Sequence, residues 1–133
     1  MSLTEVPGYR LTRKIAEGGC AEIYEGQALM GEGRVAVKIL HQRNLQNKTE
    51  YKRLLAEGVL GRNLPAHEHV VRVLASGKHQ NLPYVVMEFV PGKTLRELLR
   101  ERKTLSDREV FSMAQAVTSG LHFLHARKDR KST

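Results

Sequence analysis

The chain has 133 residues, a length that fits one small domain or one lobe of a larger one. Hydrophobic residues make up 41% of the sequence, which excludes wholesale disorder, but the apolar runs are too short to cross a bilayer. The net charge of +8 favours anionic partners, and a single cysteine, Cys20, excludes an internal disulfide framework.

The first part of the chain has the pattern of β-strands. Residues 11–15 and 22–27 predict two strands, and the glycine turn at residues 17–19 joins them. A β-branched run then predicts a third strand over residues 34–40. Alternation along that strand places Lys38 on the face opposite its valines.

A helix is predicted next, over residues 48–62. Its inward side carries Leu54 and, three and seven positions later, Glu57 and Gly61. Pro65 ends the helical pattern. Gly58 and Gly61 each lower helix propensity by roughly 1 kcal/mol, so we expect a mobile helix.

A hairpin and two helices complete the predicted elements. Apolar runs at residues 70–75 and 82–89 predict strands, with a polar loop at 77–81 between them. Each helix that follows begins with a capping box, a hydroxyl residue followed three places later by glutamate: Thr94 with Glu97, and Ser106 with Glu109. This order of strands and segregated helices predicts an α+β fold.

Four segments are candidates for chemistry, and each also has an ordinary structural interpretation. The turn at residues 16–21 is rich in small residues, so its backbone N–H groups can approach a phosphate, although most glycine hairpins bind nothing. Lys38 can be a ligand or a solvated lysine. Glu57 can face inward or pair with Arg53 on the surface. The strand exit at residues 84–92 can present free backbone groups or be a plain edge.

Other constellations point less clearly to a site. His67 with His69, and His122 with His125, offer two metal ligands each without a third, so we predict no metal site. The basic run at residues 127–131 is typical of a solvated tail. Nucleic-acid binding stays a minor alternative, because aromatic residues are only 5% of the chain and tryptophan is absent.

The order and spacing of the four segments resemble the N-terminal lobe and hinge of Hanks-type Ser/Thr protein kinases, above all the bacterial ones. The resemblance rests on E-G-G-C-A-E-I-Y at residues 17–24, V-A-V-K at 35–38, a helix with Glu57, and V-V-M-E-F-V-P-G-K-T-L at 85–95. It extends over residues 9–124. It divides the chain into an N-terminal tail, an N-lobe with hinge, the first C-lobe helices and a basic tail: residues 1–8, 9–92, 93–126 and 127–133.

The resemblance implies an ATP site and a lysine–glutamate pair. Lys38 would contact the α- and β-phosphates and pair with Glu57. Met87 would be the gatekeeper, and backbone groups of Glu88 and Val90 would meet the adenine edge. The full set of implied nucleotide-binding residues is Ile15, Ala16, Glu17, Gly18, Gly19, Cys20, Ala21, Ile23, Ala36, Lys38, Met87, Glu88 and Val90.

The sequence departs from the family pattern in two respects. Ala16 and Ala21 replace glycines of the phosphate loop, so we expect a loop that lies further from phosphate or is stiffer. The family motifs H-R-D-x-x-x-x-N and D-F-G do not occur in the sequence. Because these motifs supply the catalytic base and the Mg²⁺ ligands, we expect no phosphoryl transfer by this chain alone. A truncated or split kinase, or a frameshifted product, would have this sequence.

ATP is the expected cofactor, and the sequence contains no Mg²⁺-binding residues of the family type. The predicted helix at residues 106–125 carries an apolar stripe, for which we expect self-association or a protein partner: Val110, Met113, Val117, Leu121 and Leu124. A non-catalytic interaction module is the alternative function. One cysteine and an N-terminus without a secretion signal lead us to expect a cytoplasmic protein.

Overall fold

The computed structural model describes residues 4–31 and 33–132, of which residues 128–132 are described by their backbone alone. Contacts divide the chain into two compact units. The first unit contains Met1–Leu64 and Arg72–Phe89, and the second contains Pro65–Val71 and Val90–Thr133. Each unit is described by itself below.

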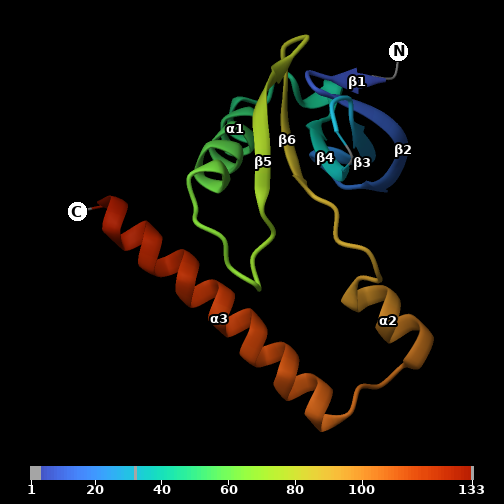
Figure 1. The fold of residues 1–133 in the computed structure, drawn as a ribbon, viewed down its shortest axis with the longest axis vertical. Helices are drawn as coiled ribbons and strands as arrows, with labels where there is room; N and C mark the ends of the chain where they lie inside the picture. The colour runs from blue at the N-terminus through green and yellow to red at the C-terminus, as the bar shows by residue number, and fades with distance from the viewer. Residues whose placement is uncertain (1–3, 32, 133) are drawn as a thin grey trace. The chain divides into compact units, whose positions relative to one another are not determined.

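An antiparallel six-stranded sheet forms the centre of the first unit (Figure 1). Its strands lie in the order β1-β2-β3-β4-β6-β5, so β4 and β6 are neighbours although α1 and β5 separate them in sequence. The strand bounds are β1 Glu5–Val6, β2 Tyr9–Glu17, β3 Ala21–Ala28, β4 Arg34–Leu40, β5 Val73–His79 and β6 Leu82–Glu88. The sheet and its accompanying helices confirm the predicted α+β class.

The two faces of the sheet have different roles. Val35, Val37 and Ile39 point to one face, where they are 3%, 0% and 4% exposed and form the main core. Lys38 points to the other face, and its register partners there are Ile23 on β3 and Val85 on β6. The alternation predicted for this strand is therefore confirmed, and it separates a dry core from a face that carries polar groups.

Helix α1, Lys48–Arg62, packs beside β5 on the face that carries Lys38 (Figure 1). The Asn47 side chain accepts a hydrogen bond from the Glu50 N–H and caps the start of the helix. A Cβ on Gly58 would lie 2.5 Å from the Cβ of Ser76, and one on Gly61 would lie 2.3 Å from a methyl carbon of Val73. The two glycines thus allow the helix backbone to approach β5 closely, which a propensity argument does not reveal.

The hairpin of β5 and β6 differs from the sequence prediction. The first strand begins at Val73 rather than at residue 70 and continues to His79, so the expected loop at 77–81 is mostly strand. The connection is the two-residue turn Gln80–Asn81, with φ values of 52° and 67°. Positive φ at both positions is characteristic of a tight hairpin turn. Asparagine tolerates a positive φ better than most residues do. Strand β1 and the short helix η1, Gln42–Asn44, were not predicted.

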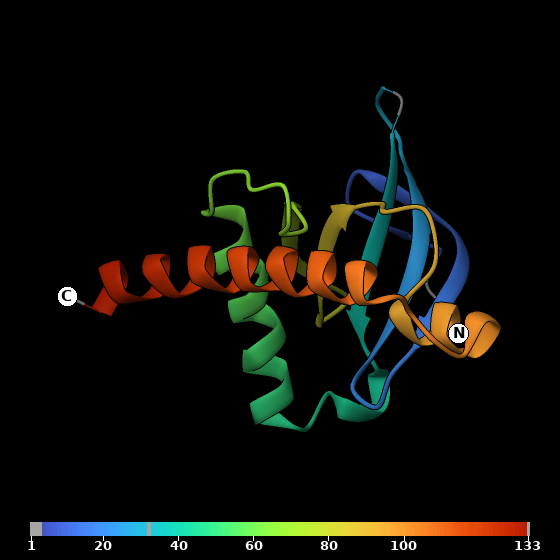
Figure 2. The ribbon, with the colours of Figure 1, turned by 90° about the horizontal axis from the view of Figure 1, so that it is seen from below.

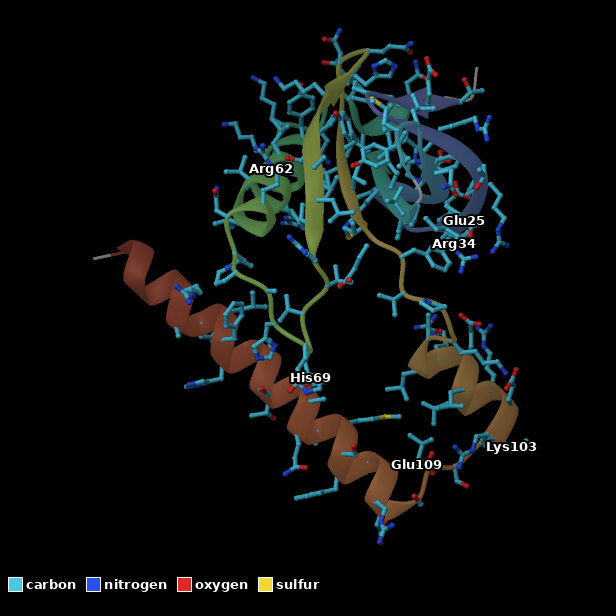
Figure 3. All side chains as sticks on the ribbon, viewed as in Figure 1. Glu25, Arg34, Arg62, His69, Lys103 and Glu109 are labelled. Carbon is cyan, nitrogen blue, oxygen red and sulfur yellow. The ribbon has the colours of Figure 1, made fainter. Side chains whose placement is uncertain are left out.

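The second unit contains two helices, α2 over Leu95–Arg102 and α3 over Asp107–Ser132. Both predicted capping boxes are present, at Thr94 and at Ser106. Residues 65–71 lie along α3, where a Cβ on Gly120 would come 3.0 Å from the His69 carbonyl oxygen (Figure 3). Helix α3 continues through residues 127–132, where the sequence predicted a tail. In the described part of the chain, no helix has the length and apolarity needed to span a membrane.

Candidate nucleotide-binding site

The glycine-rich turn connects β2 to β3 in the first unit (Figure 2). The Gly18 N–H donates to the Ala21 carbonyl at 2.9 Å and closes the turn. Ala16 is in register with Ile23 on β3, and neither alanine of the turn is among the described residues with positive φ. The two alanines therefore occupy conformations that any L-residue adopts.

Lys38 and Glu57 form an ion pair beside this turn. The lysine comes from β4 and the glutamate from α1, and the Lys38 Nζ lies 3.2 and 3.4 Å from the two carboxylate oxygens of Glu57. The side chains are 32% and 42% exposed, so both partners remain accessible to a ligand. Arg53, the surface alternative for Glu57, pairs with Glu50 instead at 3.3 Å.

A cavity of about 40 Å³ lies between the turn, β4 and α1. Cys20, Lys38, Glu50 and Glu57 are among the residues that line it. A hydrogen bond to Glu50 raises the pKa of the exposed Cys20 thiol, because the interaction stabilises the protonated form. The thiol is therefore held in its less nucleophilic state.

The end of β6 carries the residues predicted to meet adenine. Met87 is in register with Ala36 on β4, which places the expected gatekeeper across from a small side chain. Glu88 is held by Arg72: the Glu88 N–H donates to the Arg72 carbonyl at 3.0 Å, and the carboxylate accepts from the Arg72 N–H at 2.9 Å. Val90 begins the second unit and is 65% exposed.

An Arg34 contact fixes the last residue of the first unit. The guanidinium of Arg34 lies 4.1 Å from the centre of the Phe89 ring and 3.2 Å from a carboxylate oxygen of Glu25 (Figure 3). Arg13 pairs with the same carboxylate at 2.6 Å, and these pairs hold the pKa of Glu25 below its usual value.

The predicted residues are brought together to different degrees. Register joins Ala16, Ile23 and Lys38 across three neighbouring strands, and Glu57 joins them through its ion pair. Gly18, Gly19 and Cys20 form the turn next to this row. Ile15 lies in an irregular stretch of β2 and is 39% exposed.

Three residues that contact the turn were missed by sequence reasoning. Nε2 of His41 lies 2.9 Å from the Gly18 carbonyl oxygen, and the Asn44 amide nitrogen lies 3.2 Å from the Gly19 carbonyl. Arg43 also reaches the Gly19 carbonyl, at 3.4 Å. No local pattern reveals these contacts, because each joins positions more than twenty residues apart.

His41, Glu17 and Glu22 lie close enough together to be compared with a metal site. However, each ring nitrogen of His41 already has an oxygen partner, and Lys14 lies 3.5 Å from Glu17 and 3.2 Å from Glu22. The Lys14 ammonium contacts both carboxylates, so the group is held together as a hydrogen-bonded cluster.

Comparison with known families identifies the class of protein. The protein kinase domain family matches residues 9–129. This match covers most of the chain, so the chain belongs to the protein kinase family. The resemblance given by the four sequence segments is confirmed.

Named relatives and solved structures agree with that assignment. The probable serine/threonine-protein kinase PknB of Lactococcus lactis is 27% identical over 119 residues, which cover 89% of this chain and 19% of the relative. A probable serine/threonine-protein kinase of Clostridium perfringens is 32% identical over 117 residues, which cover 88% and 17%. The solved PknI kinase domain of Mycobacterium tuberculosis superposes with a TM-score of 0.82 at 24% identity, over 96% of this chain and 53% of that domain. At that identity the superposition supports the fold alone. The chain thus spans about a fifth of these curated relatives and about half of the solved kinase domain.

Proposed function

We propose that this chain is the ATP-binding part of a Ser/Thr protein kinase domain. The observation that carries the proposal is the ion pair of Lys38 and Glu57, 3.2 Å apart beside a glycine-rich turn in a chain of the kinase family. A lysine held by a glutamate presents a fixed ammonium group to phosphate oxygens. The curated relatives are named serine/threonine-protein kinases, which favours this substrate class.

The residues present fit a nucleotide. Ile15, Ile23 and Ala36 would enclose the adenine ring from the sheet side, and backbone groups of Glu88 and Val90 would meet its edge. Ala36 is small enough to leave room for a flat ring beside Lys38. When bound, ATP supplies the phosphoryl group, and this chain's residues orient it by holding its base and its α- and β-phosphates.

A pair of lysine variants tests the proposal by calorimetry on the full chain. We expect ATP to bind with a Kd on the order of 1 mM, mostly through adenine. Lys38→Met should weaken ATP about tenfold and leave adenosine unchanged, because only phosphate contacts are lost. Lys52→Met, at an exposed position of α1, is the matched control and should change neither ligand. Equal losses for ATP and adenosine in Lys38→Met would contradict the assigned role.

We further propose that the 133-residue chain by itself transfers no phosphate. The sequence contains neither H-R-D-x-x-x-x-N nor D-F-G, so family-type groups for the base and for Mg²⁺ are not supplied by it. Incubation with ATP, Mg²⁺ or Mn²⁺ and protein substrates should give no more incorporation than the Lys38→Met variant does. Transfer that disappears in that variant would show an unforeseen catalytic group.

The apolar side of α3 favours a second role, as an interaction module that associates with a second copy. Val110, Val117 and Leu121 on one side of the helix are 52%, 60% and 48% exposed. A contiguous exposed stripe of this kind in a protein commonly marks an interface. This role does not need ATP, so it is separable from the first proposal.

A further inference from the structure

The segment that follows β4 holds the carbonyl groups of the glycine-rich turn. His41 Nε2 lies 2.9 Å from the Gly18 carbonyl oxygen, and its backbone N–H donates to the Cys20 carbonyl at 2.9 Å. The Asn44 amide donates to the carbonyls of Gly19 and Cys20 at 3.2 and 3.1 Å. Three consecutive carbonyls are thus held by residues that directly follow the strand carrying Lys38.

This arrangement determines which way the turn presents its N–H groups. In a trans peptide the C=O and the following N–H point in opposite directions. Since the carbonyls of Gly18 and Gly19 point to the 41–44 segment, the amides of Gly19 and Cys20 point away from it. Phosphate oxygens are bound by such amides and repelled by carbonyl oxygens.

His41 is the most constrained member of the segment. Its side chain is only 6% exposed, and its Nδ1 lies 3.0 Å from a carboxylate oxygen of Glu22. A hydrogen bond from the Tyr24 hydroxyl, together with Lys14, lowers the pKa of Glu22, so Glu22 is an ionised acceptor. The Gly18 carbonyl is also only an acceptor. Both ring nitrogens therefore face acceptors, and both contacts are hydrogen bonds only when both nitrogens carry protons.

We propose that His41 is a positioning residue for nucleotide phosphate: its ring joins the Gly18 carbonyl to the Glu22 carboxylate and so keeps the Gly19 and Cys20 amides turned toward the ligand. The inference rests on the proposed ATP binding and names the residue that orients the turn for it.

Charged groups on the neighbouring strands surround the His41 ring. Glu17 and Glu22 face the ring from β2 and β3, at 3.7 and 3.0 Å. Lys14 pairs with these carboxylates, Tyr24 donates to Glu22, and Arg43 on η1 contacts the Gly19 carbonyl. Desolvation and the neighbouring Glu22 raise the pKa of Tyr24 to about 12, so the Tyr24 hydroxyl keeps its proton and remains a donor to Glu22.

Two substitutions and a control test the proposal, with ATP and adenosine as probes of the full chain. His41→Phe removes both donors and should weaken ATP about three- to tenfold, the effect of one net hydrogen bond, while adenosine is unchanged. His41→Gln keeps an N–H donor near the position of Nε2, so it should preserve ATP binding. His125→Gln, at an exposed position of α3, is the matched control.

The comparison of the two His41 variants is the decisive measurement, because a merely structural histidine would affect ATP and adenosine alike. His41→Gln should restore the ATP affinity that His41→Phe loses. Equal losses of ATP and adenosine in His41→Phe, or no rescue by His41→Gln, overturns the proposal. If His41→Phe does not fold, the amide signals of the turn decide alone.

Amide signals of the turn distinguish failure of the inference from failure of the proposed function. The amide signals of Gly19 and Cys20 should shift when ATP, but not adenosine, is added to the wild type or to His41→Gln. A chain that binds neither ATP nor adenosine overturns the proposed function and the inference with it. Normal ATP binding to which these two amides do not respond overturns only the inference.

Discussion

Helices α1 and α3 both bring a glycine close to a neighbouring segment, but the partners differ. On α1, Gly58 faces the side chain of Ser76 on β5, and Leu54 is buried beside it. On α3, Gly120 faces a backbone carbonyl of residues 65–71, while Val117 and Leu121 stay 60% and 48% exposed. Backbone proximity rather than the number of apolar residues therefore marks the packed side of each helix. An apolar stripe alone does not show that a face is covered.

The largest expected effect comes from filling the α1 contact. In Gly58→Ala the new Cβ would lie 2.5 Å from the Ser76 Cβ, whose position is fixed by the strand backbone. Overpacking of this severity should cost about 3 kcal/mol and outweigh the roughly 1 kcal/mol that alanine gains in helix propensity. We expect a net loss of about 2 kcal/mol in the free energy of unfolding, measured by urea titration.

The same experiment has an internal control. Val59→Ala changes an exposed neighbour on α1 and should alter stability by less than about 0.5 kcal/mol. Adding Ser76→Gly to Gly58→Ala removes the nearest atoms, so the two changes together should be less harmful than their sum. A stabilised Gly58→Ala variant would show that the helix is not packed closely on β5.

A charged substitution on the exposed apolar side of α3 should have a somewhat smaller effect, and that effect should be on self-association. Each large side chain that a dimer buries contributes roughly 1.5–3 kcal/mol. If a second copy covers the stripe, Leu121→Glu should weaken dimerisation at least tenfold, as seen by light scattering across a concentration series. Gln115→Glu adds the same charge to the other side of the helix and should leave association unchanged. A wild-type chain that stays monomeric at high concentration would contradict the proposed association.

The smallest effect concerns how the two helices begin. The Arg102 guanidinium and the Ser106 N–H donate to Glu109, and these contacts, chiefly those of Arg102, lower the pKa of Glu109 to about 2. A lowered pKa in the folded state means that this contribution is complete above the ordinary glutamate range and is lost as pH falls toward about 2. The first turn of α3 should therefore fray in acid, measured by amide exchange.

Helix α1 supplies the comparison for that experiment. Its cap is the neutral amide of Asn47, which does not titrate, so protection of the Glu50 amide should not follow the same acid transition. Glu109→Gln should abolish the pH dependence at α3. Identical acid profiles at the two helix starts would show that Glu109 is not the cause.

The sequence predicted elements well where local chemistry defines them. β4 and α1 have the predicted bounds, because a β-branched run and a helical period followed by a proline are local signals. The Lys38–Glu57 pair was inferred only through the family resemblance. The start of β5, the Gln80–Asn81 turn and the role of Gly58 depend on partners distant in the chain, so no window of sequence contains them. The His41 contacts were missed for the same reason.

The pairing of β4 with β6 has a consequence for the order of folding. Hairpins β2–β3, β3–β4 and β5–β6 join strands that are adjacent in the chain, and each closes a short loop. Pairing Lys38 with Val85 instead encloses residues 39–84, which contain all of α1. Closing a longer loop costs more chain entropy and slows the search for contacts. The strands that carry Lys38 and Met87 should therefore meet late, so the proposed nucleotide site is among the last parts of the first unit to assemble.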